Sequence, residues 1–232
     1  AGRFQGRGIV TAAGGAAYYT CAYVMIRMLR KLGCSLPVEL WHLGPYELDD
    51  RMRAIMESGE LGDVRCVDAY QVRKEHPCRI LNGWELNPYS MLHSRFKEVL
   101  FLDADNVPVV NPEFLFKTKE YADTGAIFWP DYKNMDLGPS HPIWAATGAK
   151  PHGGRSFESG QMLVDKERGW LPLNLAMHYN ENSDYYYRII HGDKDTYHMA
   201  WTRLAVPYTH IPHEIEQLPA KPSHSLVMCQ HD

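Results

Sequence analysis

Two aspartates in close succession, Asp103 and Asp105, directly follow an unbroken apolar run, Val99–Leu102, and Asn106 comes next. Such a run predicts a strand that is buried on both faces and ends where the carboxylates begin. In open α/β sheets, ligands bind just beyond the carboxyl ends of the strands. Oxygen ligands placed there suit Mg²⁺ or Mn²⁺, which often share their coordination with substrate phosphates. We therefore expect Asp103 and Asp105 to bind one divalent cation.

The setting of these aspartates separates them from the many Asp-x-Asp sequences that lie on surface loops and bind nothing. A core strand here delivers two acids, and no lysine or arginine follows within the next few residues. Like charges held close together are unfavourable unless a cation joins them. The motif alone is weak evidence, and the strand in front of it favours the metal site.

Two further groups of acids are candidates for chemistry. Glu158 precedes a short apolar strand at residues 162–164, and Asp193, Lys194 and Asp195 open a helix that runs to Leu204. An aspartate at a helix start is often only a cap. Two acids around a lysine at one helix start form a denser polar cluster than a cap requires, so we include all four residues among the candidates.

The bulk properties of the chain exclude several classes of protein. It has 232 residues, 45% of them hydrophobic, and a net charge of −4. These values fit an ordinary globular core and argue against nucleic acid as the main partner. No apolar run approaches ~18–20 residues, so we expect no transmembrane segment in this chain, and its start shows no signal-peptide pattern. The five cysteines are scattered and form no C-x-x-C pair, which favours a reducing compartment.

Strands and helices alternate at short spacing along the chain. The pattern predicts strands at 8–13, 38–43, 64–67, 99–102, 125–129, 162–164 and 206–211, and helices at 16–32, 47–58, 83–96, 168–182 and 192–204. This order predicts an α/β fold with a mixed, mostly parallel sheet flanked by helices. We expect one domain over residues 1–232 in two halves, 1–106 and 107–232, which a resemblance to a known family assigns to nucleotide binding and to the acceptor and donor sugar. Residues 133–157 are expected to form a lid or an acceptor-binding loop.

The first strand leads through Gly14 and Gly15 into the first helix. A strand, a glycine turn and a helix bring backbone N–H groups to a nucleotide, although an ordinary turn has the same pattern and neither G-x-G-x-x-G nor a Walker loop is present. Tyr18 could stack on a base or simply pack. Arg95 could reach a phosphate or be a solvated charge at a helix end.

The order of five motifs carries a resemblance to a known family. They are G-I-V-T-A-A-G-G, D-A-D-N-V-P, G-A-I-F-W-P-D-Y, E-S-G-Q-M-L-V-D-K and H-G-D-K-D-T. Together they resemble nucleotide-sugar glycosyltransferases of the GT-A fold, with the α-mannosyltransferases of family 71 as the nearest group and family 8, the glycogenin-like enzymes, further away. The resemblance implies metal-dependent transfer of a hexose, first of all mannose, from GDP-mannose or a UDP-hexose to a glycan or other hydroxyl acceptor. It also implies retention at the anomeric carbon, and Mn²⁺ or Mg²⁺ as the cofactor.

The resemblance also assigns roles to individual residues. Asp103 and Asp105 match the metal-binding pair, and His231 lies near a late metal-binding histidine of family 8. Glu158 lies where family 8 has the asparagine of a sugar-contacting Asn-Ala-Gly motif, and the glutamate is a departure from it. Lys194 lies where family 8 has the glutamine of an Asp-Gln-Asp motif near the donor sugar, and the lysine is a second departure. The donor contacts implied in this way are Thr11, Ala12, Ala13, Asp103, Ala104, Asp105, Gly160 and Gln161.

Retention requires either a carboxylate nucleophile or attack from the same face within a short-lived ion pair. The candidate acids are Glu158, Asp193 and Asp195, and we favour Asp193 as the group that stabilises the oxocarbenium-like centre. Lys194 would orient Asp193 or touch phosphate. The sequence leaves both mechanisms open. It also leaves open whether Trp129, Asp131 and His191 contact the acceptor or only support the fold.

Other functions fit parts of the sequence. A UDP-glucose or UDP-galactose transferase like those of family 8 is the nearest alternative. A nucleotidyltransferase that makes sugar nucleotides would normally carry a basic, glycine-rich loop after the first strand, and residues 14–18 contain no basic residue. A non-catalytic sugar-binding module would not need paired acids on a buried strand.

The location of the protein depends on its origin. The chain starts almost at its first strand and stops without an obvious terminating element, as a catalytic domain trimmed at both ends would. We expect the cytoplasm for a bacterial protein, and the Golgi lumen for a trimmed eukaryotic catalytic domain.

Overall fold

The computed structural model describes residues 4–151, 155–219 and 226–231. The strands are β1 (Arg7–Ala12), β2 (Val38–His42), β3 (Val64–Asp68), β4 (Glu98–Leu102), β5 (Ala126–Pro130), β6 (Phe157–Asp165), β7 (Thr209–His210), β8 (Glu216–Pro219) and β9 (Leu226–Cys229). The helices are α1 (Gly15–Lys31), α2 (Asp50–Met56), α3 (Ala69–Glu75), α4 (Leu86–His93), α5 (Lys119–Thr124), α6 (Ile143–Thr147), α7 (Trp170–Glu181), α8 (Ser183–Tyr186) and α9 (Lys194–Leu204), with 3₁₀ turns η1 (Pro112–Lys117) and η2 (Lys133–Met135).

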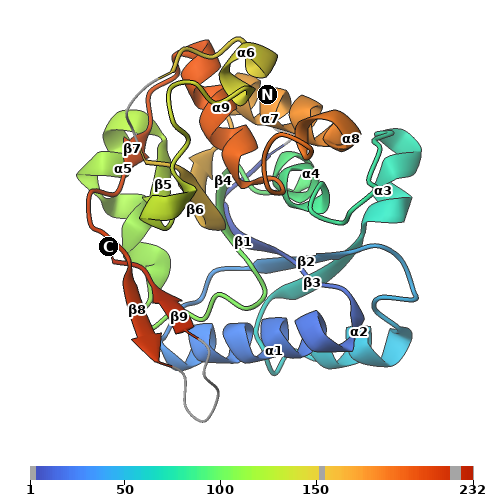
Figure 1. The fold of residues 1–232 in the computed structure, drawn as a ribbon. Helices are drawn as coiled ribbons and strands as arrows, with labels where there is room; N and C mark the ends of the chain where they lie inside the picture. The colour runs from blue at the N-terminus through green and yellow to red at the C-terminus, as the bar shows by residue number, and fades with distance from the viewer. Residues whose placement is uncertain (1–3, 152–154, 220–225, 232) are drawn as a thin grey trace.

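In this part of the chain, seven strands form one sheet in the order β3-β2-β1-β4-β6-β5-β7 (Figure 1). Strands β3, β2, β1 and β4 are parallel, β6 runs antiparallel between β4 and β5, and β7 is parallel to β5. Strands β8 and β9 pair separately as an antiparallel hairpin. The predicted α/β fold with a mixed, mostly parallel sheet is confirmed.

Strand β4 lies at the centre of the sheet and is buried on both faces, as the apolar run predicted. Val99 and Phe101 belong to one hydrophobic core, whereas Leu100 and Leu102 belong to the other. Alternate residues of a strand point to opposite faces, so a strand covered on both sides must be apolar throughout. The strand ends at Leu102, and Asp103 is therefore the first residue to leave the core.

Helices cover the two faces of the sheet (Figure 1). On one face α1 buries Ala22, Met25, Ile26 and Leu29, a spacing that places apolar side chains on one side of a helix. Helices α4, α7 and α9 contribute to the core on the other face. The two layers fix the sheet between them, and they leave the carboxyl ends of β1 and β4 facing the same edge.

The strand and helix predictions fail mainly in the second half of the chain. Residues 133–157 contain η2 and α6 rather than a plain loop, and the late strand shrinks to the two residues of β7. Strand β6 is longer than predicted because it starts at Phe157. Helices α3, α5 and α8, the turn η1 and the β8–β9 hairpin were not expected, because their short sequences contain too little periodicity. The division into two functional halves stays a prediction.

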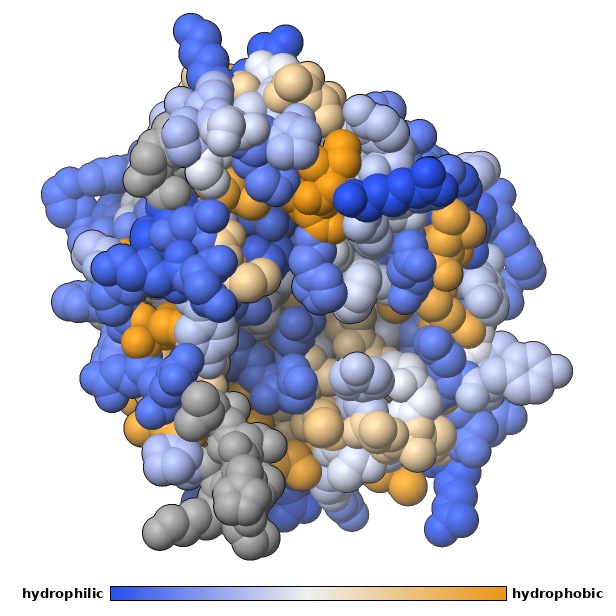
Figure 2. All heavy atoms as spheres, viewed as in Figure 1, coloured by the Kyte–Doolittle hydropathy of each residue, from blue (hydrophilic) through white to orange (hydrophobic). Residues whose placement is uncertain are grey.

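The face of the molecule seen in Figure 2 is mostly polar. Hydrophilic residues cover most of this face, and hydrophobic residues lie in separate patches. None of the helices in the described ranges is both long enough and apolar enough to cross a membrane. The exposed aromatic residues include Tyr18 and Trp84, and both belong to the site described next.

Candidate functional site

The two aspartates follow β4 and are tied to β6. The backbone N–H of Asp103 donates to the carbonyl of Gly160 at 2.8 Å, and the side-chain amide of Asn106 donates to the same carbonyl at 2.8 Å. The N–H of Asn106 donates to the carbonyl of Asp103 at 3.0 Å, which closes a turn. The carbonyl of Gly160 thus holds the Asp-Ala-Asp segment at both ends.

A bulge in β6 brings Gly160 to this position. Phe128 of β5 pairs with Met162, but the next residue, Trp129, pairs with Glu158, which lies four residues from Met162. Residues 159–161 therefore arch away from β5 at the edge where Asp103 emerges. The N–H of Gly160 donates to Glu158 Oε2 at 2.6 Å, and a Cβ at position 160 would approach that oxygen to 2.8 Å. The glycine lets the Glu158 carboxylate fold back over its own strand.

Asp103 and Asp105 lie in the wall of a cleft of about 580 Å³. The cleft is lined by the β1–α1 turn, by the loop before α4, and by the segment before α9. Its lining residues include Ala12, Ala13, Gly14, Tyr18, Glu47, Asn82, Trp84, Asn87, Asp103, Ala104, Asp105, Ser159, His191, Asp193 and Lys194. A second cavity of about 530 Å³ shares Asp103 and Asp105, and it is lined by Glu158, Gly160 and Gln161 together with the apolar residues of the 107–115 segment and the β8–β9 hairpin. Asp103 and Asp105 therefore lie between the cleft and the second cavity.

The acids around the cleft raise one another's pKa. Burial raises the pKa of Asp103 well above its ordinary value, and the negative charges of Asp193, Glu158 and Asp105 raise it further. Burial also raises the pKa of Glu158 to about 7, although the hydrogen bond from Gly160 opposes this shift. These groups therefore form a field that favours a cation.

Asp193 is buried and held by two donors. Asn87 Nδ2 donates to its Oδ2 at 3.1 Å, and the Tyr197 hydroxyl donates to the same oxygen at 3.3 Å. Burial raises the pKa of Asp193 to about 6, and the two hydrogen bonds limit this rise. The carboxylate is thus fixed in orientation and stays mainly ionised at neutral pH.

The residues fit a divalent cation in the way that Mg²⁺ and Mn²⁺ are usually bound. Asp103 and Asp105 supply two carboxylates, and neither forms an ion pair with a basic side chain among the described residues. The described ranges contain no group of three or more His, Cys, Asp and Glu side chains that could hold a metal. Such cations are often bound by one or two carboxylates, with substrate phosphates and water completing the shell.

Lys194 lies between two buried carboxylates. Its Nζ is 3.0 Å from Asp131 Oδ2 and 3.1 Å from Asp195 Oδ2, and all three side chains are almost fully buried. Asp131 directly follows β5, whereas Lys194 and Asp195 begin α9. The ion pairs therefore join the end of the sheet to the helix that carries the segment beside Asp193.

Replacing Lys194 by methionine is expected to lower the free energy of unfolding by about 3–5 kcal/mol, because it leaves two buried carboxylates without a cation. Urea denaturation monitored by circular dichroism measures the change. Adding Asp195→Asn to the Lys194→Met variant should restore part of the loss. Lys97→Met, which removes an exposed lysine paired with Glu167, is the control and should change stability little. Equal stability of Lys194→Met and wild type would contradict the structural role.

Most predicted donor and catalytic residues meet at the cleft. Ala12, Ala13, Tyr18, Asp103, Ala104, Asp105, Asp193 and Lys194 line it, and Glu158, Gly160 and Gln161 line the adjoining cavity. His191, expected as an acceptor contact, also lines the cleft. Asp195 does not line the cleft. It forms an ion pair with Lys194, which does line it, and so supports the cleft wall. Roles in binding and catalysis stay predictions.

Several of the expected contacts are not brought to the cleft, among them Asp131, which pairs with Lys194. Arg95 precedes β4 and so lies at the opposite end of a strand about 16 Å long, where it pairs with Asp63 at 3.1 Å and Glu39 at 3.7 Å. The structure therefore does not bring Arg95 to the cleft, where one of the two alternatives placed it. It lies just beyond the end of α4 and is paired with two carboxylates. Thr11 is fully buried within β1, and its hydroxyl has no hydrogen-bond partner among the described residues.

The late histidine and the β5 tryptophan also have other partners. His231 Nε2 faces Glu216 Oε1 at 3.3 Å, and no described group of three metal-binding side chains includes it with the two aspartates. Trp129 is fully buried, and its indole N–H donates to the carbonyl of His231 at 2.9 Å. Trp129 therefore anchors the C-terminal segment, and its side chain is not open to an acceptor.

The sequence analysis missed several residues of the cleft. Asn87, Ser159, Trp84 and Glu47 line it, and Asn87 also orients Asp193. A signal was present for Asn87, because an asparagine in the middle of an otherwise apolar helical segment requires a polar partner. The glycine before Trp84 marked a turn. Neither pattern indicates which other segment lies opposite.

Comparisons with known proteins identify the family. Residues 6–151 and 149–222 match the family described as "Mannosyltransferase putative". The chain is 29% identical over 268 residues to the alpha-1,2-mannosyltransferase MNN5 of Saccharomyces cerevisiae (strain YJM789), covering 90% of this chain and 45% of that protein. It is 27% identical to the alpha-1,2-mannosyltransferase MNN21 of Candida albicans, covering 89% and 39%. The chain thus spans less than half the length of these relatives.

Solved structures with a similar fold include glycosyltransferases. The galactosyltransferase LgtC, in complex with donor and acceptor sugar analogs, has a TM-score of 0.59 at 14% identity, covering 87% of this chain and 72% of that chain. Mouse xyloside xylosyltransferase 1 has a TM-score of 0.55 at 15% identity, covering 88% and 84%. Identities this low show a shared fold alone. With the family match over most of its length and a sheet of the GT-A type, the chain belongs to this mannosyltransferase family.

Proposed function

We propose that this chain is a glycosyltransferase domain that transfers mannose from a nucleotide-diphosphate sugar to a hydroxyl group of a glycan, with a divalent cation at Asp103 and Asp105. The observation that supports this most strongly is the carboxylate pair at the end of β4 in the wall of a 580 Å³ cleft, in a chain of the mannosyltransferase family. The cleft is large enough for a nucleotide sugar.

The lining of the cleft suggests how the donor lies. The backbone of Ala12 and Ala13 and the exposed ring of Tyr18 offer a surface for the nucleoside at the β1–α1 turn. The diphosphate would lie at Asp103 and Asp105, where a bound divalent cation would stabilise the negative charge of the leaving group. The hexose would then extend toward Asp193, on the opposite wall.

The reaction would replace one bond to the anomeric carbon by another on the same face. The bond between that carbon and the diphosphate oxygen breaks, the acceptor oxygen forms the new bond, and its proton passes to the departing diphosphate. Asp193 is the acid that we favour beside the anomeric carbon, because its carboxylate is oriented by Asn87 and Tyr197 and would stabilise positive charge there. Glu158 suits a nucleophile less well, since it lines the adjoining cavity rather than the cleft.

Calorimetry with GDP-mannose, UDP-glucose and UDP-galactose, with and without Mn²⁺, tests the proposal. We expect one of the three to bind with Mn²⁺ and to lose its binding in EDTA. We also expect transfer of the hexose to a manno-oligosaccharide. Absence of binding by all three in the presence of Mn²⁺ would contradict the proposal. Binding of a nucleoside triphosphate instead would favour a nucleotidyltransferase, a class with a neighbour of similar fold in 4-diphosphocytidyl-2C-methyl-D-erythritol synthase (TM-score 0.51).

The fungal relatives also bear on location. Both named relatives come from eukaryotes, Saccharomyces cerevisiae and Candida albicans. This origin favours the second of the two locations that the sequence analysis left open, so we propose the Golgi lumen. Fluorescence microscopy of the tagged full-length protein would test it.

A further inference from the structure

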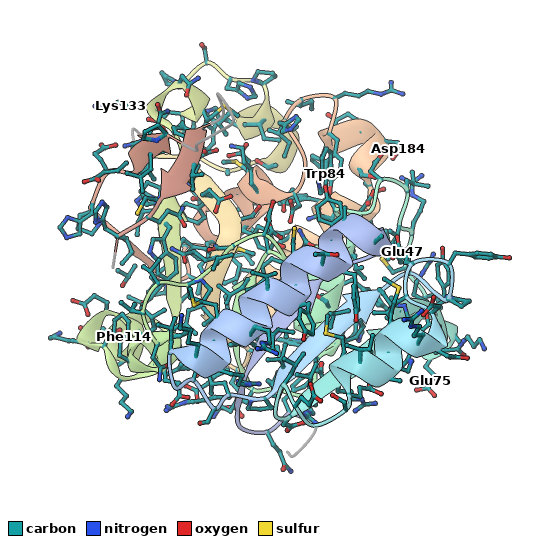
Figure 3. The ribbon with its side chains drawn as sticks, turned by 90° about the horizontal axis from the view of Figure 1, so that it is seen from below. Glu47, Glu75, Trp84, Phe114, Lys133 and Asp184 are labelled. Atoms are coloured by element: carbon teal, nitrogen blue, oxygen red, sulfur yellow. The ribbon has the colours of Figure 1, made fainter. Side chains whose placement is uncertain are left out.

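Trp84 is a large aromatic side chain that remains exposed at the rim of the cleft. Its residue is 45% exposed, although it lines the cleft. Its ring centroid lies 5.5 Å from that of His191 and 6.0 Å from that of Tyr187. In Figure 3, Trp84 lies near Glu47, another residue of the lining, beyond the N-terminal end of α1. An indole in this position keeps a large apolar surface in contact with water.

The backbone around Trp84 is firmly held. Glu85 is fully buried, and its carboxylate accepts hydrogen bonds from the N–H of Asn82 at 3.0 Å and from the Ser183 hydroxyl at 2.5 Å. The carbonyl of Trp84 accepts a hydrogen bond from the N–H of Asn87 at 3.0 Å. The ring is therefore presented by a fixed turn rather than by a free loop. A fixed, exposed aromatic side chain in a cleft is preorganised for a ligand.

The opposite side of the rim approaches the ring closely. Gly192 has a φ of +67°, and a Cβ at this position would lie 3.4 Å from the indole, which is van der Waals contact. His191 is exposed, and Asp193 follows Gly192 directly, so the segment that faces Trp84 also carries the acid beside the reacting carbon. The polar side chains of His191, Asp193 and Asp105 line the same cleft. The ring is thus apolar, whereas polar groups line the cleft beside it.

This combination selects a particular class of ligand. A pyranose has one face of C–H groups, which packs on an aromatic ring, and hydroxyl groups around its edge, which need polar partners. A purely apolar ligand would leave the polar groups of the rim unsatisfied. The nucleoside has its own exposed aromatic surface in Tyr18, at the β1–α1 turn. The indole ring of Trp84, at the rim of the cleft, is therefore available to the acceptor sugar, which enters after the donor.

We propose that Trp84, with His191 beside it, is the stacking surface for a pyranose ring of the acceptor, and that it holds this ring with one hydroxyl group directed toward Asp193. The inference rests on the proposed function, which supplies the donor. It adds the residue that determines acceptor binding, and it assigns the acceptor end of the cleft to the loop before α4.

Kinetic measurements on Trp84→Ala and Trp84→Phe test this role, with α-linked mannobiose as the acceptor. Removing the ring is expected to raise the acceptor KM about tenfold or more, and to change the donor KM much less. Trp84→Phe should restore most of the acceptor affinity. Trp84→Leu, which keeps apolar bulk without an aromatic face, should resemble the alanine variant. Trp170→Ala removes a 37%-exposed tryptophan outside the cleft and is the matched control.

A binding measurement separates this inference from the proposed function. Titration of mannobiose into the protein with nucleoside diphosphate and Mn²⁺ should change the tryptophan fluorescence of the wild type and of Trp170→Ala, but much less that of Trp84→Phe. If the wild type transfers mannose and Trp84→Ala has an unchanged acceptor KM, the stacking role is wrong while the proposed function stands. If the wild type binds no nucleotide sugar, the proposed function fails and this inference fails with it.

Discussion

Asp103→Asn and Asp105→Asn are each expected to lower the transfer rate by about 10³-fold, because each removes one unit charge that helps to bind the cation. At about 4 Å and an effective dielectric constant of about 20, one charge pair contributes on the order of 4 kcal/mol, which corresponds to this factor. Initial rates with saturating donor and a series of Mn²⁺ concentrations measure the effect. Asp184→Asn, which changes an exposed aspartate of α8 paired with Arg79, should keep full activity.

The stability of Asp103→Asn provides a readout without catalysis. In the absence of metal, the pKa of Asp103 is raised in the folded state, so its ionisation destabilises the fold increasingly as pH rises above the ordinary value. The variant is therefore expected to have a higher Tm than the wild type at pH 7.5 in EDTA. The two should converge below about pH 3, where the carboxyl is protonated in both the folded and the unfolded state. Mn²⁺ should raise the Tm of the wild type only. If Asp103→Asn and Asp105→Asn both keep full activity and are stabilised by Mn²⁺ as much as the wild type, the proposed metal site is wrong.

Asp193→Asn is expected to lower kcat by about 10²–10³-fold, since it removes the charge that faces the developing positive centre. An asparagine can keep an acceptor oxygen for Asn87 and Tyr197, so the fold and the donor affinity should change little. Calorimetry with donor and Mn²⁺ checks binding, and single-turnover transfer checks the chemical step. A loss of donor binding as large as the loss of rate would indicate a binding role.

Glu158→Gln provides the comparison for Asp193→Asn. Glu158 lines the adjoining cavity rather than the cleft, so the glutamine variant should lose less activity than Asp193→Asn. The reverse order, with Asp193→Asn active and Glu158→Gln inactive, would transfer the catalytic role to Glu158 and favour a covalent intermediate. Trapping a glycosyl-enzyme by mass spectrometry would then identify the nucleophile.

The sheet could be predicted largely from the sequence because its strands are strongly patterned. Residues 99–102 alternate between two cores, which requires four apolar side chains in succession. Helix α1 has an apolar face of ordinary spacing. Asp103 and Asp105 were found for the same reason, since their position depends only on where one strand ends. A structural feature that depends on one strand or helix alone can be predicted from the sequence of that strand or helix.

The rest of the site depends on contacts between distant segments. The bulge at residues 159–161 is defined by pairing with β5 and β4, and no local pattern in Glu158-Ser159-Gly160 indicates it. The position of Arg95 stayed open in the sequence because a helix-end arginine looks the same whether it faces a phosphate or Glu39 and Asp63. The partnership of Asn87 with Asp193 joins residues 106 positions apart. Such pairs become visible only when the two segments are seen together.

The carbonyl of Gly160, which accepts hydrogen bonds from both Asp103 and Asn106, has a consequence for protein engineering. The proposed metal-binding segment, residues 103–106, and the bulge of β6, residues 159–161, hold each other in shape, although they lie far apart in the sequence. Transplanting residues 103–106 into a related scaffold would therefore not reproduce the original loop shape unless residues 158–162 were moved with them. Directed evolution of donor preference is best applied to both segments in one library, because a change of length in either would shift the other.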